Sequence, residues 1–418
     1  MKPERKKVVL VGGGFAGLHV AKALKKSNYD VLLIDKQNHH QFQPLYYQVA
    51  SARLEPSNIS FPFRKIFQRS KHVQIRMAEV TGIKPESNQV ETSIGNFDYD
   101  YLVLATGCKT NFFGNAEIEK YALSMKTTEE SIEIRNQILM NFEKLISAKA
   151  EERQSLLNIV LVGAGPTGVE LAGAFAEMKK NILPRDYPHM DFSGLNVFLL
   201  EGSKHTLNSM SEEAKVASRR YLEELGVIVK TETFVKNYDG ETAVLNNGET
   251  IPTQSLIWAA GVTGNIIPGL KPENIIRNRY KVDRYNKVLD TKNIYAIGDI
   301  AYMETPNYPT GHPQLANVAI NQGKNLAQNL IKLMKGKEPV EYEYKDLGSM
   351  ATVGKHKAVV DLPFLKFHGY IAWFFWMFLH LMLILSVRNK LQIFFNWAWN
   401  YLAKDSSLRL ILTRKDKI

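Results

Sequence analysis

The sequence predicts an α/β fold with two Rossmann-like dinucleotide-binding domains, one inserted into the other, and a C-terminal amphipathic helical region. A glycine-rich turn of one spacing occurs twice, each time between a strand-like and a helix-like segment, and this predicts the two domains. An apolar segment near the C-terminus predicts the helical region. The 418 residues exceed what one hydrophobic core usually holds, and 45% hydrophobic and 23% charged residues are ordinary for a globular chain.

Composition narrows the classes of function. The formal net charge of +11 suits an anionic partner, which could be nucleic acid, a dinucleotide or an acidic lipid surface. The single cysteine, Cys108, excludes a disulfide framework, a CxxC redox pair and a cysteine-based zinc site, and we predict no metal site. The N-terminal MKPERKK runs directly into an apolar strand, so no signal peptide is expected.

The first glycine-rich turn lies near the N-terminus. The segment VVLVGGGFAGLHVAKAL carries Gly12, Gly14 and Gly17 at GxGxxG spacing, and the next strand, VLLID, ends in Asp35. The first glycine permits the tight turn, the second lets the backbone approach a pyrophosphate, and the third lets helix and strand touch. The phosphate is expected at the helix N-terminus, where free N–H groups and the helix dipole favour negative charge.

A second unit repeats this pattern. NIVLVGAGPTGVELAGAFAEM places Gly163, Gly165 and Gly168 at the same spacing, and the later strand NVFLLE ends in Glu201. One such turn is a weak signal because glycines occur in many loops, but two turns with the same strand, helix and acid predict two dinucleotide sites. An acid at the position of Glu201 can accept hydrogen bonds from both ribose hydroxyls and repel a 2′-phosphate, which favours NADH over NADPH.

Two later strands assign the cofactors. YDYLVLATG, residues 99–107, ends in a small-residue turn that can pass close to a cofactor, and NIYAIGDIA, residues 293–301, contains Gly298 and Asp299. An acid there can hydrogen-bond a ribityl hydroxyl, although a turn-capping aspartate is the alternative. The second glycine unit lies between these strands, so we predict an NAD domain inserted into an FAD domain. The expected division is 1–125 and 271–335 for FAD, 126–270 for NADH and 336–418 for the C-terminal anchoring region.

With these motifs the sequence resembles the two-dinucleotide-binding-domain flavoproteins, and within them the type II NADH dehydrogenases. The narrower resemblance rests on FQPLYYQVA, HPQLANVAINQGKNLAQNL, GSMATVGKHKAVVDL and the aromatic C-terminal segment, and it covers nearly the whole chain. It implies FAD-dependent transfer of two electrons from NADH to a membrane quinone in a respiratory chain, without proton pumping. Disulfide reductases and sulfide:quinone oxidoreductases share the architecture but need cysteines that a single Cys108 does not supply.

The resemblance also implies site residues. For FAD they are Gly12, Gly14, Phe15, Ala16, Gly17, Asp35, Lys36, Gln43, Val80, Ala105, Thr106, Gly107, Asp299, Ala316 and Asn317; for NADH they are Gly163, Gly165, Gly168, Glu201 and Gly261; for the quinone they are Asn317, Ala319, Asn321 and Gln322. The family usually has AQxAxQ on the last helix, whereas this chain has ANVAINQ. Asparagine keeps the amide donor and acceptor of glutamine but is one methylene shorter.

Glu170, in the segment GPTGVELAG, is the candidate catalytic residue. In the family the matching acid lies between nicotinamide and quinone, and quinone reduction takes up protons as well as electrons. Glu170 is therefore expected to serve a proton route or a nicotinamide contact. The alternative is a first-turn glutamate that complements the helix dipole. Hydride transfer itself needs no acid or base from the protein, so the fold has only to stack the two rings.

The C-terminal segment YIAWFFWMFLHLMLILSV, residues 370–387, holds no Lys, Arg, Asp or Glu. Its aromatic residues, with the Trp and Tyr residues and cations that follow, are typical of helices that lie in a membrane interface and attract anionic lipid. The residues concerned are Tyr370, Trp373, Phe374, Phe375, Trp376, Phe378, Arg388, Lys390, Trp397, Trp399, Tyr401, Lys404, Arg409, Arg414, Lys415 and Lys417. We expect a monotopic anchor on the cytoplasmic face of the cell membrane; a true span and a buried dimer helix are the alternatives.

The partners follow from these expectations. They are a membrane quinone and the lipid bilayer surface, with no nucleic acid, and a homodimer is left open. A second interpretation shares every dinucleotide motif: a flavoprotein that senses NADH or reduces another acceptor, with the C-terminus as a partner-binding module. The two interpretations differ in how fast a quinone reoxidises the NADH-reduced protein.

Overall fold

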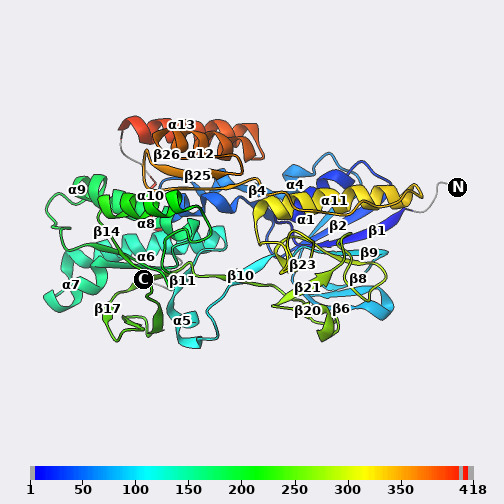
Figure 1. The fold of residues 1–418 in the computed structure, drawn as a ribbon, viewed down its shortest axis with the longest axis horizontal. Coiled ribbons are helices and arrows are strands. Elements are labelled where there is room, and N and C mark those ends of the chain that lie inside the picture. Colours follow the sequence, from blue (N-terminus) through cyan, green and yellow to red (C-terminus); the bar gives the residue numbers. More distant parts are fainter. Residues whose placement is uncertain (1–4, 404–407, 413–418) are drawn as a thin grey trace. The chain divides into compact units, whose positions relative to one another are not determined.

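The structure is a computed structural model that describes residues 5–403 and 408–412. By its internal contacts the chain separates into two compact units. As far as residues are described, the first comprises Met1–Gln41, Phe61–Lys109 and Val262–Asp346, and the second comprises Phe42–Ser60, Thr110–Gly261 and Leu347–Ile418. Each unit contains a five-stranded parallel sheet with helices packed on it, which confirms the predicted α/β fold (Figure 1).

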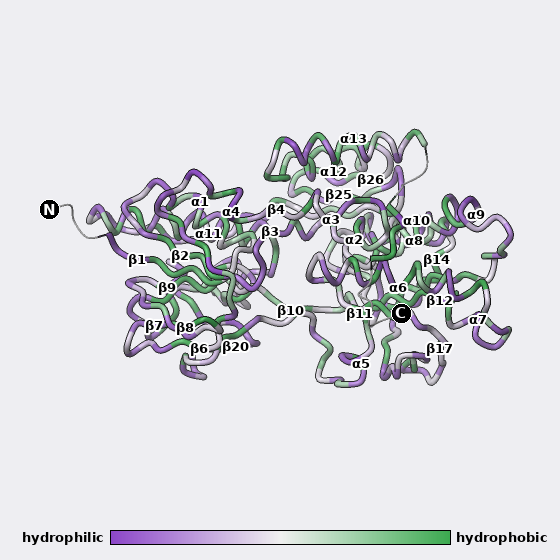
Figure 2. Tube along the Cα trace, turned by 180° about the vertical axis from the view of Figure 1, so that it is seen from behind, coloured by the Kyte–Doolittle hydropathy of each residue, from purple (hydrophilic) through white to green (hydrophobic). Residues whose placement is uncertain are grey.

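The sheet of the first unit has the strand order β22-β9-β1-β2-β5. Its strands are largely continuous apolar runs because helices and loops cover both faces of the sheet. In Figure 2 the colour of hydrophobic residues runs along these strands. Two smaller sheets, β6-β7-β8 and β20-β21-β23, accompany it. The elements are β1 Lys6–Val11, α1 Phe15–Leu24, β2 Tyr29–Asp35, β3 His39–Gln41, α4 Phe63–Ile66, β5 Val73–Met77, β6 Val80–Lys84, β7 Gln89–Thr92, β8 Gly95–Asp98, β9 Tyr101–Leu104, β20 Ile275–Ile276, β21 Arg279–Val282, β22 Ile294–Ala296, η4 Gly298–Ile300, β23 Ala301–Met303 and α11 Ala316–Met334.

Helices α1 and α11 pack against each other over this sheet (Figure 1). Gly323 of α11 permits the contact, because a Cβ at this position would lie 2.5 Å from the carbonyl oxygen of Ala16 in α1. The N-terminal half of α11 is therefore held beside the first glycine turn. Four strand segments contain or adjoin points where the chain passes from one unit to the other: β3 His39–Gln41, β4 Ser60–Pro62, β10 Cys108–Thr110 and β19 Val262–Gly264.

The parallel sheet of the second unit has the strand order β11-β18-β12-β13-β14. A three-stranded antiparallel sheet, β15-β16-β17, lies between β14 and β18 in the chain. The first two residues of α2, which belongs to this unit, are buried, and α2 packs on α6 and α8. The elements are η1 Gln43–Leu45, α2 Tyr46–Ala50, α3 Pro56–Ile59, α5 Ala116–Tyr121, β11 Leu123–Ser124, α6 Thr128–Ser147, α7 Ala150–Leu157, β12 Asn158–Val162, α8 Pro166–Asn181, α9 Leu183–Asp186, β13 Asn196–Leu200, α10 Glu212–Glu224, β14 Val227–Lys230, β15 Val235–Tyr238, β16 Thr242–Leu245, β17 Thr250–Pro252 and β18 Ser255–Trp258.

The C-terminal region of the second unit is an antiparallel sheet followed by two helices. The sheet consists of β24 Ser349–Thr352, β25 Ala358–Leu362 and β26 Leu365–Gly369, and the helices are α12 Tyr370–Leu383 and α13 Val387–Ala403. Helix α12 packs on β25 and β26, and α13 lies beside it (Figure 1). The segment 370–387 is thus not one helix, and no helix in the described part of the chain is long and apolar enough to cross a membrane.

The aromatic residues of these helices divide into two faces. Ala372, Trp376 and His380 form a buried stripe along α12, and Ile393 and Trp397 are the buried residues of α13. The expectation that Trp376 and Trp397 lie in a lipid interface is therefore wrong. Helical periodicity did not reveal which face meets protein. Lys404, Arg414, Lys415 and Lys417 lie outside the described residues.

The compact units and the predicted domains use different boundaries. The chain changes unit after Lys109 and Gly261, whereas the domains were predicted to change after residues 125 and 270. Residues 42–60 and the C-terminal region group with the second unit, where α2 and β24 pack against α8. Ligand-defined domains are a separate question, so the predicted division stays a prediction.

Candidate active site

The first glycine turn follows β1 and is fixed by close backbone contacts. Gly12 has φ +99° and donates its N–H to the carbonyl of Ile34 at 2.8 Å. A Cβ at Gly12 would lie 2.3 Å from the carbonyl oxygen of Ala105, and one at Gly17 would lie 1.9 Å from that of Gly12. The protein itself therefore requires glycine at these two positions.

Gly14 differs from its neighbours. It is the N-cap of the ten-residue helix α1, its φ of −65° suits any residue, and a Cβ there would meet no protein atom within 4 Å. The space beside Gly14 is thus open, at the point where the first N–H groups of a helix face outward. This cradle fits a pyrophosphate, and an added side chain would fill it.

The acid at the end of β2 closes the turn. Asp35 accepts a hydrogen bond from Gly13 N–H at Oδ2 (2.6 Å) and from Gln37 N–H at Oδ1 (2.7 Å). Burial raises the pKa of Asp35, and these two N–H groups oppose the shift. A carboxylate can accept about four hydrogen bonds, so Asp35 retains capacity for the hydroxyls of a ribose.

A second polar cluster lies after β22, at the edge of the sheet where β1 and β9 also end. The Cys108 thiol donates to Oδ2 of Asp299 at 3.0 Å, which makes Cys108 a partner of the predicted flavin-binding acid. Gln322 accepts the N–H of Gly298 at Oε1 (2.7 Å). Its Nε2 is buried without a hydrogen-bond partner among the described residues. An orphaned buried donor beside Asp299 fits a cofactor that supplies the missing acceptor.

The other predicted FAD residues are spread around this edge. Ala105, Thr106 and Gly107 directly follow β9, Phe15 and Ala16 begin α1, and Ala316 and Asn317 form the first turn of α11. Lys36 is exposed and paired with Glu79, and Val80 begins β6. Gln43 is exposed and lies in η1 of the second unit. Its predicted contact with the flavin therefore stays a prediction.

The second glycine turn repeats the first almost contact for contact. Gly163 has φ +101° and donates to Leu200 O at 2.8 Å, and Ala164 N–H donates to Oε2 of Glu201 at 2.7 Å. The N–H and hydroxyl of Ser203 both donate to Oε1 of Glu201 at 2.8 Å. A Cβ at Gly168 would lie 1.9 Å from Gly163 O, as at the third glycine of the first turn.

The open position recurs as well. A Cβ at Gly165 would meet nothing within 4 Å, and Gly165 is the N-cap of the sixteen-residue helix α8. Gly261, which follows β18, has φ +88° and is exposed beside the ring of Phe113, 3.1 Å from an added Cβ. The second unit thus presents the same kind of cradle as the first, with a shape that fits a pyrophosphate.

Glu170 lies in the second turn of α8, not in the first. Its side chain is buried, and Oε1 accepts the backbone N–H of Thr352 at 3.3 Å. Burial raises the pKa of Glu170 to about 8, while the backbone N–H of Thr352, Trp376 and the Thr352 hydroxyl oppose this shift. Among the residues that the structure describes, the Trp376 indole nitrogen has no hydrogen-bond partner of good geometry, so its effect is electrostatic. Glu170 is therefore a carboxylic acid that holds its proton at neutral pH.

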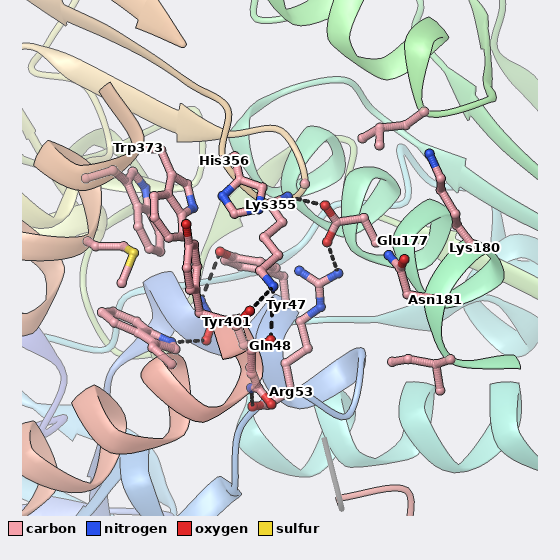
Figure 3. Close-up of a pocket in the computed structure, with 17 residues that line it drawn as sticks. Tyr47, Gln48, Arg53, Glu177, Lys180, Asn181, Lys355, His356, Trp373 and Tyr401 are labelled. Carbon is pink, nitrogen blue, oxygen red and sulfur yellow. Dashed lines mark hydrogen bonds and ion pairs between the residues drawn. The ribbon is translucent and has the colours of Figure 1, made fainter. Parts of the chain in front are cut away.

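A cavity of about 360 Å³ lies in the second unit near this acid (Figure 3). Arg53 donates to Glu177 at 2.6 Å and to the carbonyl of Ala174 at 3.2 Å, and the Lys355 ammonium donates to two carbonyls at the C-terminal end of α13. The residues that line the cavity are Tyr47, Gln48, Arg53, Glu177, Lys180, Asn181, Ile182, Leu225, Gly354, Lys355, His356, Trp373, Trp376, Met377, Trp397, Asn400 and Tyr401.

The sequence analysis did not assign these residues to a cavity. Tyr47, Gln48 and Lys355 lie inside FQPLYYQVA and GSMATVGKHKAVVDL, which served only to recognise a resemblance, and Glu177 lies inside the second glycine unit. Arg53 lies in none of these segments, and the lining residues Trp373, Trp376, Trp397 and Tyr401 were expected only in the membrane anchor. Their roles depend on packing between segments far apart in the chain. The only sequence signal is the rarity of fully buried charged residues, which cannot be read before burial is known.

Comparison with known proteins places the chain in a family. A model of the pyridine nucleotide-disulphide oxidoreductases matches residues 6–323, and one of the NDH2 C-terminal domain matches residues 347–404. A type II NADH:quinone oxidoreductase of Mycobacterium tuberculosis, Ndh, is 32% identical over 96% of this chain and 89% of its own length. The chain belongs to the type II NADH:quinone oxidoreductases. The second Mycobacterium tuberculosis enzyme, NdhA, is 33% identical over 96% of this chain and 88% of its own length.

More distant relatives agree with this family. The Staphylococcus aureus type II NADH:quinone oxidoreductase is 28% identical over 86% of this chain and 90% of its own length. The structure of NDH2 from Plasmodium falciparum in complex with NADH superposes with a TM-score of 0.90 at 22% identity, covering 98% of this chain and all of that one. That superposition supports the fold alone. As a member of this family the chain is an enzyme of the NADH dehydrogenase class.

The predicted quinone residues lie on α11 in different environments. Asn317 and Asn321 are half-buried, whereas Ala319 and Gln322 are buried. The side chain of Gln322 accepts the N–H of Gly298, so it contacts the turn that also holds Asp299. Quinone contact through these four residues stays a prediction. Within the described residues no group of three His, Cys, Asp or Glu side chains is placed to hold a metal ion.

Proposed function

We propose that this enzyme uses FAD to transfer two electrons from NADH to a membrane quinone, without pumping protons, while attached to the cytoplasmic face of the cell membrane. The observation that carries the proposal is the pair of open glycines, Gly14 and Gly165, each at a helix N-terminus with an acid beside the turn. Two such cradles in one chain suit two dinucleotides.

The first cradle is the proposed FAD site. Asp35 would bind the ribose, Asp299 a ribityl hydroxyl, and the first turn of α11 would approach the flavin ring. When bound, FAD supplies the ability to accept two electrons as a hydride from NADH and to pass them to the quinone. The orphaned Nε2 of Gln322 supports this assignment because a bound cofactor would satisfy it.

The second cradle is the proposed NADH site. Glu201 keeps its carboxylate beside the turn through the N–H groups of Ala164 and Ser203. A carboxylate held there can bind the 2′- and 3′-hydroxyls of a ribose and would repel a 2′-phosphate. We therefore expect NADH, not NADPH, as the substrate.

Glu170 is the proposed proton donor for the quinone. It is buried and protonated at neutral pH, and a donor must carry its proton before the transfer. Reduction of a quinone to a quinol needs two electrons and two protons. The hydride of NADH supplies both electrons and one proton, so the second proton comes from water. No step in this scheme moves charge across a membrane, which agrees with an enzyme that does not pump.

The outward faces of α12 and α13 are the proposed membrane contact. They expose large apolar side chains that no described segment covers: Ile371, Phe374, Phe378, Met382, Leu391, Phe394, Phe395 and Leu402. Ile371 is 75% exposed and Phe395 64%, and side chains of this size favour an interface over water. A quinone with a long apolar tail is dissolved in the bilayer, so its reductase must work at the membrane surface.

The test is a reduction and reoxidation cycle on the purified protein. We expect a yellow protein that bleaches when NADH is added without oxygen and regains its colour rapidly when a quinone follows. A colourless protein would remove the FAD assignment. Bleaching with slow or absent reoxidation by quinones would instead favour an NADH sensor or another acceptor.

A further inference from the structure

A chain of polar contacts joins Glu170 to helix α13. The Thr352 backbone N–H donates to Oε1 of Glu170 at 3.3 Å, and the Thr352 hydroxyl lies 3.1 Å from the hydroxyl of Tyr47. The Thr352 hydroxyl also acts on the Glu170 carboxyl, whose pKa it lowers. The Nε2 of Gln48 donates to that same Tyr47 oxygen at 3.0 Å. The indole N–H of Trp397 donates to Oε1 of Gln48 at 2.8 Å. All five residues are buried and belong to the second unit.

The indole fixes the direction of this chain. A tryptophan N–H can only donate, so the side-chain oxygen of Gln48 must face Trp397 and its NH₂ must face Tyr47. The Tyr47 oxygen therefore accepts, and its own proton is free to point at Thr352. The Thr352 hydroxyl can then direct its own proton at the Glu170 carboxyl. This arrangement allows both hydroxyls to point their protons toward the carboxyl.

The other end of the chain reaches the cavity. Tyr47 and Gln48 line it, and Figure 3 shows both side chains at its wall. A polar cavity of about 360 Å³ has room for several waters, each of which needs about 30 Å³ in the liquid. Glu170 itself does not line the cavity. The route from cavity water to the acid therefore passes through the two hydroxyls.

We propose that the hydroxyls of Tyr47 and Thr352 relay protons from water in this cavity to Glu170 during quinone reduction, and that Trp397 of α13 sets the direction of the relay. The proposal rests on the role of Glu170 given above. In this scheme the hydroxyls of Tyr47 and Thr352 carry the protons, and Gln48 and Trp397 are positioning residues.

The transfer balances with water as the only proton source. Glu170 gives its proton to a quinone oxygen, and the resulting carboxylate takes the proton of the Thr352 hydroxyl. The Thr352 oxygen takes the proton of Tyr47, and the Tyr47 oxygen takes one from cavity water, which leaves as hydroxide to the solvent. No charge stays on either hydroxyl, and rotation of both O–H groups restores the first state. Burial raises the pKa of the Tyr47 hydroxyl, so it starts protonated, as a relay requires.

Charged groups from each neighbouring element face the relay. Arg53 follows α2, and Glu177 and Lys180 lie on α8. Lys355 and His356 lie in the turn after β24. On α12, His380 stacks on Trp376 with its ring centroid 3.9 Å away, and burial lowers the pKa of His380 to about 4, so it is neutral. The cations outnumber Glu177 at the cavity, which disfavours a positive charge on the relay itself and suits a stepwise hop between neutral hydroxyls.

The experiment uses the full-length holoenzyme in stopped flow. Tyr47→Phe and Thr352→Val remove one hydroxyl each, and Thr352→Val leaves the backbone N–H that binds Glu170. Both variants should keep the flavin and the rate of bleaching by NADH, and should slow reoxidation by a short-chain quinone about a hundredfold, the low end of general acid catalysis. Thr352→Ser should restore the parent rate. Imidazole, which fits the cavity, should speed reoxidation of Tyr47→Phe.

The neighbouring tyrosine is a matched control. Tyr46 lies on the same helix, is equally buried, and hydrogen-bonds Thr128 instead of Thr352. Tyr46→Phe should therefore reoxidise like the parent. Trp397→Phe removes the donor that orients Gln48 and should slow reoxidation without changing the bleaching rate.

The outcomes separate the relay from the role of Glu170. Slow reoxidation in Glu170→Gln with normal Tyr47→Phe and Thr352→Val would overturn the relay and leave the donor in place. Normal reoxidation in Glu170→Gln would overturn the proposed donor and the relay with it. If Tyr47→Phe and Thr352→Val also lost flavin or slowed bleaching, or if Thr352→Ser were as slow as Thr352→Val, the hydroxyls would be structural and the relay would be wrong.

Discussion

Replacing Glu170 by glutamine should change how the stability of the second unit depends on pH. Burial raises the pKa of Glu170 from its ordinary value of 4.5 to about 8 in the folded state. Between these two values the unfolded chain has released the proton that the folded chain still binds. The free energy of unfolding of the parent therefore falls as pH rises through this range, by about 1.4 kcal/mol per pH unit.

The magnitude follows from the two pKa values. The full effect between pH 4.5 and pH 8 is about 5 kcal/mol, and the part between pH 5.5 and 7.5 is about 3 kcal/mol. Glutamine has the same shape and no titrating proton, so Glu170→Gln lacks this slope. The variant should accordingly gain stability relative to the parent as pH rises, and the gain should level off above pH 8.

Tryptophan fluorescence is the assay of choice. The chain has five tryptophans, Trp258, Trp373, Trp376, Trp397 and Trp399, and all of them lie in the second unit. Urea unfolding followed by this signal reports that unit without interference from the first, which matters because a chain of two units need not unfold in one step. If the free energy of unfolding changed with pH in the same way for the parent and for Glu170→Gln between pH 5.5 and 8.5, Glu170 would not hold its proton through burial and the reasoning would be refuted.

Three further predictions concern the cofactors and the membrane. Gly14→Val should fold, because no protein atom lies within 4 Å of the added Cβ, yet yield colourless protein; its matched control, Gly165→Val, should stay yellow and no longer bleach with NADH. Absorbance spectra decide both, and yellow Gly14→Val would move the flavin elsewhere. Glu201→Gln should narrow the preference for NADH over NADPH in kcat/KM, and a parent that uses both equally would remove Glu201 from this role. Phe378→Glu with Phe395→Glu, both 64% exposed, should weaken liposome binding by roughly 1.5–3 kcal/mol per side chain while activity with a water-soluble acceptor persists; unchanged sedimentation with liposomes would contradict the anchor.

The dinucleotide turns were predictable because their constraints are local. Gly12, Gly17 and Asp35 meet atoms a few residues away or on the adjoining strands, and such contacts impose residue types at fixed spacing. The buried face of α12 was not predictable in the same way. Nearly every residue of that helix is apolar, so periodicity could not tell Trp376, which packs inside, from Phe378, which does not.

The relay could not be predicted from the sequence at all. Gln48 and Trp397 are 349 positions apart, and Thr352 and Glu170 are 182 apart. Hydroxyl and amide side chains at such separations carry no pattern, and only the packing of α2, α8, β24 and α13 brings them together. Glu170 was found through a resemblance, but its depth in the protein, which sets its proton affinity, came from the structure.

Loss of the hydrogen bond from Trp397 to Gln48 should affect only those electron acceptors that must also take up protons. Ferricyanide takes electrons alone, whereas even a short, water-soluble quinone must also be protonated. A variant in which α13 no longer docks should therefore still reduce ferricyanide at the parent rate but reduce a tail-less quinone slowly, although neither acceptor needs a bilayer. Comparing these two acceptors would distinguish a protein that has merely left the membrane from one that has lost its supply of protons.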